Sequence, residues 1–308
     1  MKKIVIAFSI ILIACLSSLA QSPPTLRIVT ETPGLPSELF YGNVKVKPVR
    51  LRPGTNQVIT IDDIDFLVQQ QYIDFLGRFP DQTGFQNWVN TVTGCPNGGF
   101  GENDNPSCDR VHMSAGFVQS YEFQGRGYWL LRFGYVGLNR SITDTTTGRT
   151  QRSSLTYAEF IPGLQQIGGP NSPAQEEAAK IVYMNNFVQR SDFLALFPNS
   201  DPNATYVNKL EANAGVTLTP SFKQAQVDGL NNATLTRAQV LRNIAESNEV
   251  FNKYILISFV DMEYKGYLRR DPDTIGYNNW IDTLNANPND YRHMVFGFIY
   301  SSEYRSRF

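Results

Sequence analysis

The sequence predicts a mainly α-helical protein: a helical repeat or bundle domain over residues 60–308, preceded by an extended N-terminal arm. Three observations predict it. Apolar residues fall at helical spacing from residue 60 onward, one stretch of sequence occurs twice, and residues 21–59 are rich in Pro and β-branched residues. With 308 residues, 42% hydrophobic and 18% charged, the chain is long and apolar enough to bury a sizeable core.

Residues 1–20 have the anatomy of an export signal. Lys2 and Lys3 precede an apolar run, which ends in the small-x-small site Ser18-Leu19-Ala20. The run is shorter than the ~20 apolar residues of a membrane-spanning helix, and serines interrupt it. We therefore expect an exported protein without a transmembrane span, either secreted or held at the cell surface.

A second interpretation of this segment concerns Cys15. Leu12-Ile13-Ala14-Cys15 resembles the lipobox of bacterial lipoproteins, which would make Cys15 a lipidated first residue. On either interpretation, Cys95 and Cys108 remain as an even pair in an oxidising compartment, and we expect them to form a disulfide. The turn-rich loop between them would be stabilised by about 3 kcal/mol in the chain-entropy model.

Residues 21–59 are expected to form an extended arm with one or two short strands, because short β-branched runs alternate there with Pro-Gly turns. The helical spacing begins behind Thr60-x-x-Asp63, a capping-box pattern. Further helix starts are predicted at Ser172, Thr219 and Thr236. Residues 141–156 and 198–202 have the composition of surface loops.

The chain contains an internal repeat. Residues 72–89 read YIDFLGRFPDQTGFQNWV and residues 264–281 read YKGYLRRDPDTIGYNNWI. A second block, Ser-x-Glu-aromatic, follows each copy at Ser120–Phe123 and Ser301–Tyr304. The clear copies span about 64–123 and 256–308, and the cysteine loop is an insertion into the first copy. Weaker echoes at 187–193 and 247–250 indicate a degenerate middle unit.

These two blocks resemble the bacterial secreted domain family DUF4214. The shared pattern is Leu-Gly-Arg-x-Pro-Asp-x-x-Gly-x-x-Trp, and the likeness covers about residues 60–308. The resemblance implies an all-helical module of exported or surface proteins, often beside adhesive or calcium-binding repeats, with a distant likeness to the linker domain of phycobilisomes. The family has no established catalytic residues to transfer. The middle third and the Cys95–Cys108 insertion depart from the pattern, so three equivalent sites are not implied.

The motif residues have structural roles that need no ligand. Pro80 stops the preceding helix, because proline lacks an N–H and disfavours helix in the residue before it. Asp81 then fits the N-cap of the next helix, with Gly84 in its first turn and Arg78 close enough to pair with it. The equivalent residues of the second copy are Arg270, Pro272, Asp273 and Gly276. Glu122 and Glu303 are expected at a helix end, where they would bond locally.

An apolar stripe follows the motif aspartate at positions i, i+3, i+4 and i+7. Its residues are Phe85, Trp88, Val89 and Val92 in the first copy and Tyr277, Trp280, Ile281 and Leu284 in the second. Such a stripe is typical of a helix face that packs into a core. An aromatic platform for a sugar is the alternative. The equivalent histidines His112 and His293 are interpreted as packing or capping groups.

The carboxylates of the second copy have part of the spacing of an EF-hand. The weak calcium candidates are Asp271, Asp273 and Asp282. The pattern fails at Ile275, where an oxygen ligand is required, and Phe79 replaces the first acid in the other copy. We therefore predict no metal or other cofactor.

The balance of 27 Lys and Arg against 28 Asp and Glu argues against a nucleic-acid partner. The sequence contains no nucleophile elbow, zinc-ligand helix or phosphate loop. We expect a non-enzymatic interaction or structural module of the cell envelope or extracellular space, with a polysaccharide or a protein as its partner. The alternatives are an extracellular hydrolase that acts on polysaccharide with two carboxylates, and a calcium-dependent surface assembly protein.

Overall fold

A computed structural model of the chain describes residues 26–29, 38–41, 44–46, 50–51, 58–168 and 172–308, and the mainly helical fold is confirmed. The predicted export signal and Cys15 lie outside the described residues. The α-helices are α1 Ile64–Leu76, α2 Gln82–Thr93, α3 Arg110–Gln119, α4 Tyr121–Gly125, α5 Gly127–Gly137, α6 Tyr157–Gly168, α7 Pro173–Phe187, α8 Ser191–Leu196, α9 Asn203–Ala214, α10 Pro220–Asn231, α11 Arg237–Ala245, α12 Asn248–Glu263, α13 Thr274–Ala286, α14 Tyr291–Ile299 and α15 Ser302–Arg305. Within these ranges, no helix is both long and apolar enough to cross a membrane.

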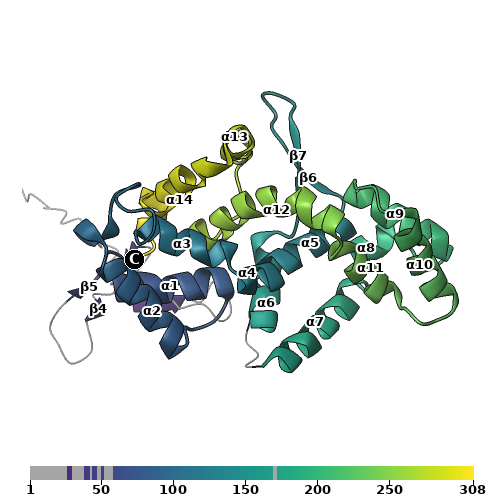
Figure 1. Ribbon diagram of the computed structural model, residues 1–308, viewed down its shortest axis with the longest axis horizontal. Helices are drawn as coiled ribbons and strands as arrows, with labels where there is room; N and C mark the ends of the chain where they lie inside the picture. Colours follow the sequence, from purple (N-terminus) through teal and green to yellow (C-terminus); the bar gives the residue numbers. More distant parts are fainter. Residues whose placement is uncertain (1–25, 30–37, 42–43, 47–49, 52–57, 169–171) are drawn as a thin grey trace, which may run out of the picture.

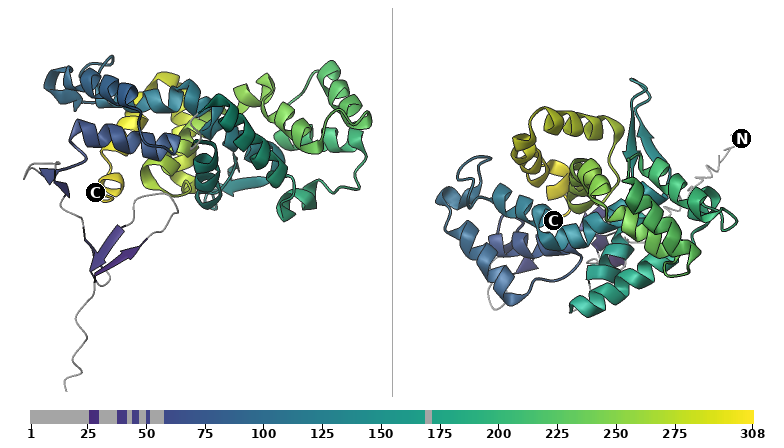
Figure 2. Two further views of the ribbon diagram at one scale, coloured as in Figure 1. Left: turned by 90° about the horizontal axis from the view of Figure 1, so that it is seen from below. Right: turned by 45° about the vertical axis from the view of Figure 1, so that its right-hand side comes forward.

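Short strands precede the helices. They are β1 Leu26–Val29, β2 Glu38–Tyr41, β3 Val44–Val46, β4 Arg50–Leu51 and β5 Val58–Ile59. They pair antiparallel as a three-stranded sheet, β1-β2-β3, and a two-stranded sheet, β4-β5. The arm thus contains more strands than the one or two expected. Its strands lie outside the helical body (Figure 2).

The loop predicted for residues 141–156 is wrong, because this segment forms a β-hairpin. Strands β6 Arg140–Thr143 and β7 Thr150–Ser153 pair antiparallel. The turn between them is closed by Asp144, whose carboxylate accepts hydrogen bonds from Thr146 N at 2.8 Å and Thr147 Oγ1 at 2.7 Å. The Thr-rich composition that suggested a loop is also favourable to strands. The hairpin projects from the molecule beside α5 (Figure 1).

The predicted helix starts are largely correct. Ser172, Thr219 and Thr236 are N-caps of α7, α10 and α11, and the last forms a capping box with Gln239. Thr60 is different, because α1 begins only at Ile64. Instead of opening the helix, the Thr60 backbone N–H donates to Asp63 Oδ2 at 2.7 Å and closes a turn ahead of it.

The first and last copies lie side by side (Figure 1). Helix α3 packs against α14, and α1 packs against the π-helical turn η2 (Tyr264–Leu268) that continues α12. Equivalent helices therefore meet each other. Phe75 contacts Tyr267, its own equivalent in the repeat, edge to face with ring centroids 4.9 Å apart. Such a self-contact is expected where two similar units are related by an approximate twofold axis.

In the middle third, α5 packs against α9 and α7 packs against α11. Helix α5 also packs against α12, where the middle third meets the last copy (Figure 1). Every residue of α5 is buried. Tyr135 of α5 stacks on Tyr254 of α12 with ring centroids 4.3 Å apart and planes 6° apart. The centre of the core is therefore aromatic.

Candidate functional site

In each clear copy, the motif arginine binds the glutamate of the second block. Arg78 Nε and Nη2 donate to Glu122 Oε1 and Oε2 at 2.5 and 2.7 Å. Arg270 donates to Glu303 in the same way, at 2.7 and 3.1 Å. We call this bidentate ion pair the clasp, because it ties the end of the copy's first helix to the start of its last short helix.

The expectation that Glu122 and Glu303 bond locally at a helix end holds only in part. Glu122 pairs with Arg126 four residues later, but both glutamates also bind the distant motif arginine. Both lie in the first turn of a new helix, α4 or α15. Ser120 and Ser301 cap these helices by accepting from backbone N–H groups three residues later, both at 3.0 Å. The chain turns at each serine, so the glutamate that follows points back to the motif arginine.

The motif aspartates lie at N-caps, where the spacing places them. Asp81 and Asp273 each accept from the backbone N–H of the motif glycine, Gly84 or Gly276, at 2.8 Å. This hydrogen bond lowers the pKa of Asp81. A Cβ at Gly84 would lie 2.3 Å from the hydroxyl oxygen of Tyr72, and the equivalent tyrosine crowds Gly276 in the same way. The glycine is therefore required by close packing. In the sequence, Pro80 and Pro272 lie between the clasp arginine and the N-cap aspartate of their copies.

The motif tryptophans pack inside their copies. Trp88 stacks on Phe117 with ring centroids 5.8 Å apart, and Trp280 lies 6.2 Å from Phe298. Each is also flanked by the repeat histidine, as the packing interpretation of His112 and His293 predicts. The rings are half-buried against these partners. They are therefore occupied by packing and do not form an open platform.

The clasp, cap and tryptophan contacts of the last copy all fall within residues 257–308, which match the family model of DUF4214, a domain of unknown function. We call residues 257–308 the DUF4214 domain after this match. No curated protein and no solved structure matches the chain. The first copy makes the same contacts as the DUF4214 domain, although the family model matches only the latter.

The carboxylates that suggested calcium in the DUF4214 domain bind separate partners. Asp271 Oδ1 accepts from Tyr157 N at 2.7 Å and from Lys265 Nζ at 3.1 Å. Asp273 caps α13, and Asp282 forms a bidentate ion pair with Arg149 of the hairpin. Because the three side chains diverge, they do not form a ligand set. Among the described residues, no group of three or more His, Cys, Asp or Glu side chains could hold a metal.

A related ion pair, which the sequence did not reveal, lies in the degenerate middle unit. Arg140 Nη2 donates a single hydrogen bond to Asp192 Oδ2 at 2.9 Å, and the bidentate partner of Arg140 is Glu159. The hairpin interrupts the motif directly after Arg140, and an aspartate replaces the glutamate. The available signal was the likeness of Phe187-Val188-Gln189 to Phe117-Val118-Gln119, which places Asp192 at the position of Glu122.

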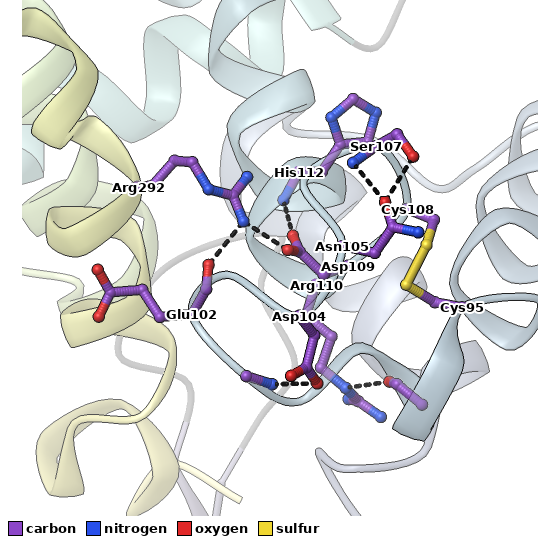
Figure 3. The surroundings of a disulfide bond; sticks show 12 residues. Cys95, Glu102, Asp104, Asn105, Ser107, Cys108, Asp109, Arg110, His112 and Arg292 are labelled. Carbon is purple, nitrogen blue, oxygen red and sulfur yellow. Dashed lines mark hydrogen bonds and ion pairs between the residues drawn. A yellow bond between two sulfur atoms is a disulfide. The ribbon is translucent and has the colours of Figure 1, made fainter.

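The predicted disulfide joins Cys95 and Cys108, with Cα atoms 5.5 Å apart. The loop that it closes binds the DUF4214 domain (Figure 3). Arg292 of α14 donates to the carbonyl of Glu102 at 2.6 Å and to Asn103 Oδ1 at 3.1 Å, and it forms an ion pair with the buried carboxylate of Asp109. The cysteine loop therefore also links the two copies, a role that no sequence motif indicates.

The first copy also exposes large apolar side chains. Phe79 is 70% exposed and Tyr121 is 90% exposed. Phe100 of the cysteine loop is covered on one face by the guanidinium of Arg110, 3.9 Å from the ring centroid. A mostly apolar pocket of about 220 Å³ opens nearby. Its walls include Val118, Phe123, Tyr128, Ile255, Phe259 and Leu284, from α3, α4, α5, α12 and α13.

Proposed function

We propose that the protein is an exported, non-enzymatic interaction module of the bacterial cell envelope or extracellular space, with a polysaccharide as its partner. One observation carries this proposal: the first copy exposes two aromatic residues, Phe79 and Tyr121, at positions where the second copy has Asp271 and Ser302. The charged and aromatic motif residues make intramolecular contacts in both copies. Phe79 and Tyr121 of the first copy instead face solvent.

Two further features support the proposal. The arrangement of residues 1–20 is typical of an export signal. A disulfide is also characteristic of proteins from oxidising compartments outside the cytosol. A helical scaffold with repeated internal ion pairs provides a rigid support for exposed groups, as a binding module requires.

The test is co-sedimentation of the purified protein with the envelope fraction of its source organism and with protein-free polysaccharide isolated from that fraction. We expect retention on both, unchanged by EDTA. Retention that EDTA abolishes would support the calcium-dependent alternative. Release of soluble sugar over time would support the hydrolase alternative. Failure to bind either material would overturn the proposal.

A further inference from the structure

The repeat provides an internal control for the positions beside the clasp. The residue after the clasp arginine is Phe79 in the first copy and Asp271 in the DUF4214 domain. The residue before the clasp glutamate is Tyr121 in the first copy and Ser302 in the DUF4214 domain. All four side chains are exposed. Since the same clasp forms with a polar pair, the fold does not require aromatic residues at these positions.

The clasp joins the two chain segments that carry Phe79 and Tyr121. Arg78 Nη1 donates to the carbonyl of Phe79 at 2.9 Å, while Nε and Nη2 of the same guanidinium bind Glu122, the neighbour of Tyr121. A guanidinium is planar and its donors have fixed directions, so it holds the two backbone segments in one arrangement. Arg270 makes the same bond to the carbonyl of Asp271, at 3.1 Å. The first copy therefore carries its two exposed rings on chain segments that one guanidinium joins.

The surroundings of the two rings are polar and without free charge. Helix α2, which follows Phe79, contains no charged residue. Its exposed side chains include four amides, Gln82, Gln86, Asn87 and Asn90. The nearby charge of Arg78 is paired with Glu122 and with Asp81, the exposed N-cap of α2. Glu122 also pairs with Arg126, whose second partner is Glu176. This surface thus offers aromatic faces and neutral hydrogen-bonding groups.

Such a combination matches the chemistry of a neutral sugar. The apolar C–H face of a pyranose ring stacks on an aromatic ring, and its hydroxyl groups pair with amide donors and acceptors. An acidic polysaccharide or a nucleic acid would require unpaired cations, which favour binding to anions. We propose that Phe79 and Tyr121 form the contact surface for a neutral polysaccharide. This inference rests on the proposed function and assigns it to a specific surface.

The experiment uses the protein-free envelope polysaccharide, separated by anion exchange into a neutral and an acidic fraction. Affinity of the whole protein for each fraction is measured by affinity electrophoresis. We expect wild-type protein to bind the neutral fraction. The Phe79→Ser/Tyr121→Ser double variant should bind it at least tenfold more weakly, because both stacking faces are removed. Tyr121→Phe, which keeps the ring, should stay within about twofold of wild type.

Ile275→Ser in the DUF4214 domain is the matched control, since Ile275 is also exposed but lies in the other copy. It should bind like wild type, and all variants should keep the wild-type thermal midpoint because the changed side chains face solvent. Equal binding by the double variant and wild type would overturn the inference and leave the proposed function standing. Binding to the acidic fraction alone would have the same consequence. Failure of wild type to bind either fraction or the intact envelope would overturn both.

Discussion

The first copy and the DUF4214 domain share their clasp and cap but join their second and third helices differently. The first copy joins α2 and α3 through a loop closed by the Cys95–Cys108 disulfide, whereas the DUF4214 domain joins α13 and α14 through the short 3-10 turn Pro288–Asp290. Arg292 of α14 binds that longer loop, and its equivalent in the first copy is Val111, a core residue. The shared contacts thus hold each copy together, and the insertion adds a contact between the two copies to the packing of α3 on α14.

The largest effect is expected from Arg292→Ala, which removes the contact between the cysteine loop and α14. The Asp109 side chain is fully buried, and its other hydrogen bond among the described residues comes from the backbone N–H of His112, 2.7 Å away. Stranding a buried charge costs about 3–5 kcal/mol. Urea unfolding of the oxidised protein should show a loss of this size. The double variant Arg292→Met/Asp109→Asn should recover most of it, since no charge is stranded. A loss below about 1 kcal/mol for Arg292→Ala would show that the loop does not hold the copies together.

The Cys95→Ser/Cys108→Ser variant should lose about 3 kcal/mol, because the unfolded chain regains the entropy of a loop whose ends are 13 residues apart. The same loop positions the Glu102 carbonyl for Arg292. The effects of removing the disulfide and Arg292 should therefore be less than additive in a double-mutant cycle measured by urea unfolding. Strict additivity would contradict a coupled role of the disulfide and the docking contact.

A third difference lies where the copies meet. Gln71 of the first copy accepts from Ser114 Oγ at 2.6 Å and donates to the Tyr304 hydroxyl at 3.4 Å. Its equivalent in α12 is Glu263, which is buried and whose carboxylate oxygens have no hydrogen-bond partner among the described residues. Burial raises the pKa of Glu263 well above its ordinary value. The carboxyl group is therefore held protonated in the folded protein over a wider pH range than in the unfolded chain.

The variant Glu263→Gln gives both copies a glutamine at this buried position. A raised folded-state pKa means that the folded state keeps its proton as the unfolded chain loses one near pH 4.3. Wild-type stability should therefore fall as the pH rises above about 4, until the folded-state pKa is reached. The variant lacks this loss, so its stability relative to wild type should rise by about 1–2 kcal/mol between pH 4 and 7. If the free energies of unfolding of wild type and Glu263→Gln changed in parallel with pH, the pKa of Glu263 would not be raised in the folded protein.

The sequence predicted contacts between residues close in the chain and missed those between distant residues. Helix caps depend on local chain direction, which short motifs encode, and so Asp81, Gly84 and most of the helix starts were found. The Glu122 partner was missed because 44 residues separate it from Arg78. Arg292 binds backbone carbonyls of a loop 190 residues earlier, and such a contact has no sequence signature. Arg140 escaped because the hairpin interrupts its motif.

The smallest effects should come from the clasps, and these effects should differ between the copies. In the first copy, Glu122 is shared by Arg78 and Arg126, and the side chains of the Arg78–Glu122 pair are only 24% and 27% exposed. In the DUF4214 domain, the residue equivalent to Arg126 is Arg307, which binds Asp74 instead, and the Arg270–Glu303 pair is 38% and 49% exposed. Partly buried charged hydrogen bonds contribute more than exposed ion pairs, which water screens.

Arg78→Ala should therefore cost about 1.5 kcal/mol and Arg270→Ala about 0.5 kcal/mol in urea unfolding. Raising the salt concentration should widen this difference in stability loss slightly, because screening acts mainly on the exposed Arg270–Glu303 pair, whose contribution is already the smaller one. Glu122→Gln and Glu303→Gln provide matched controls that remove the charge and keep the side-chain volume. If the two arginine variants lost the same free energy of unfolding, the ion pairs around Glu122 would add no stability beyond that of the Arg270–Glu303 pair. The first copy would then differ from the DUF4214 domain only in its insertion and in the residues that it exposes.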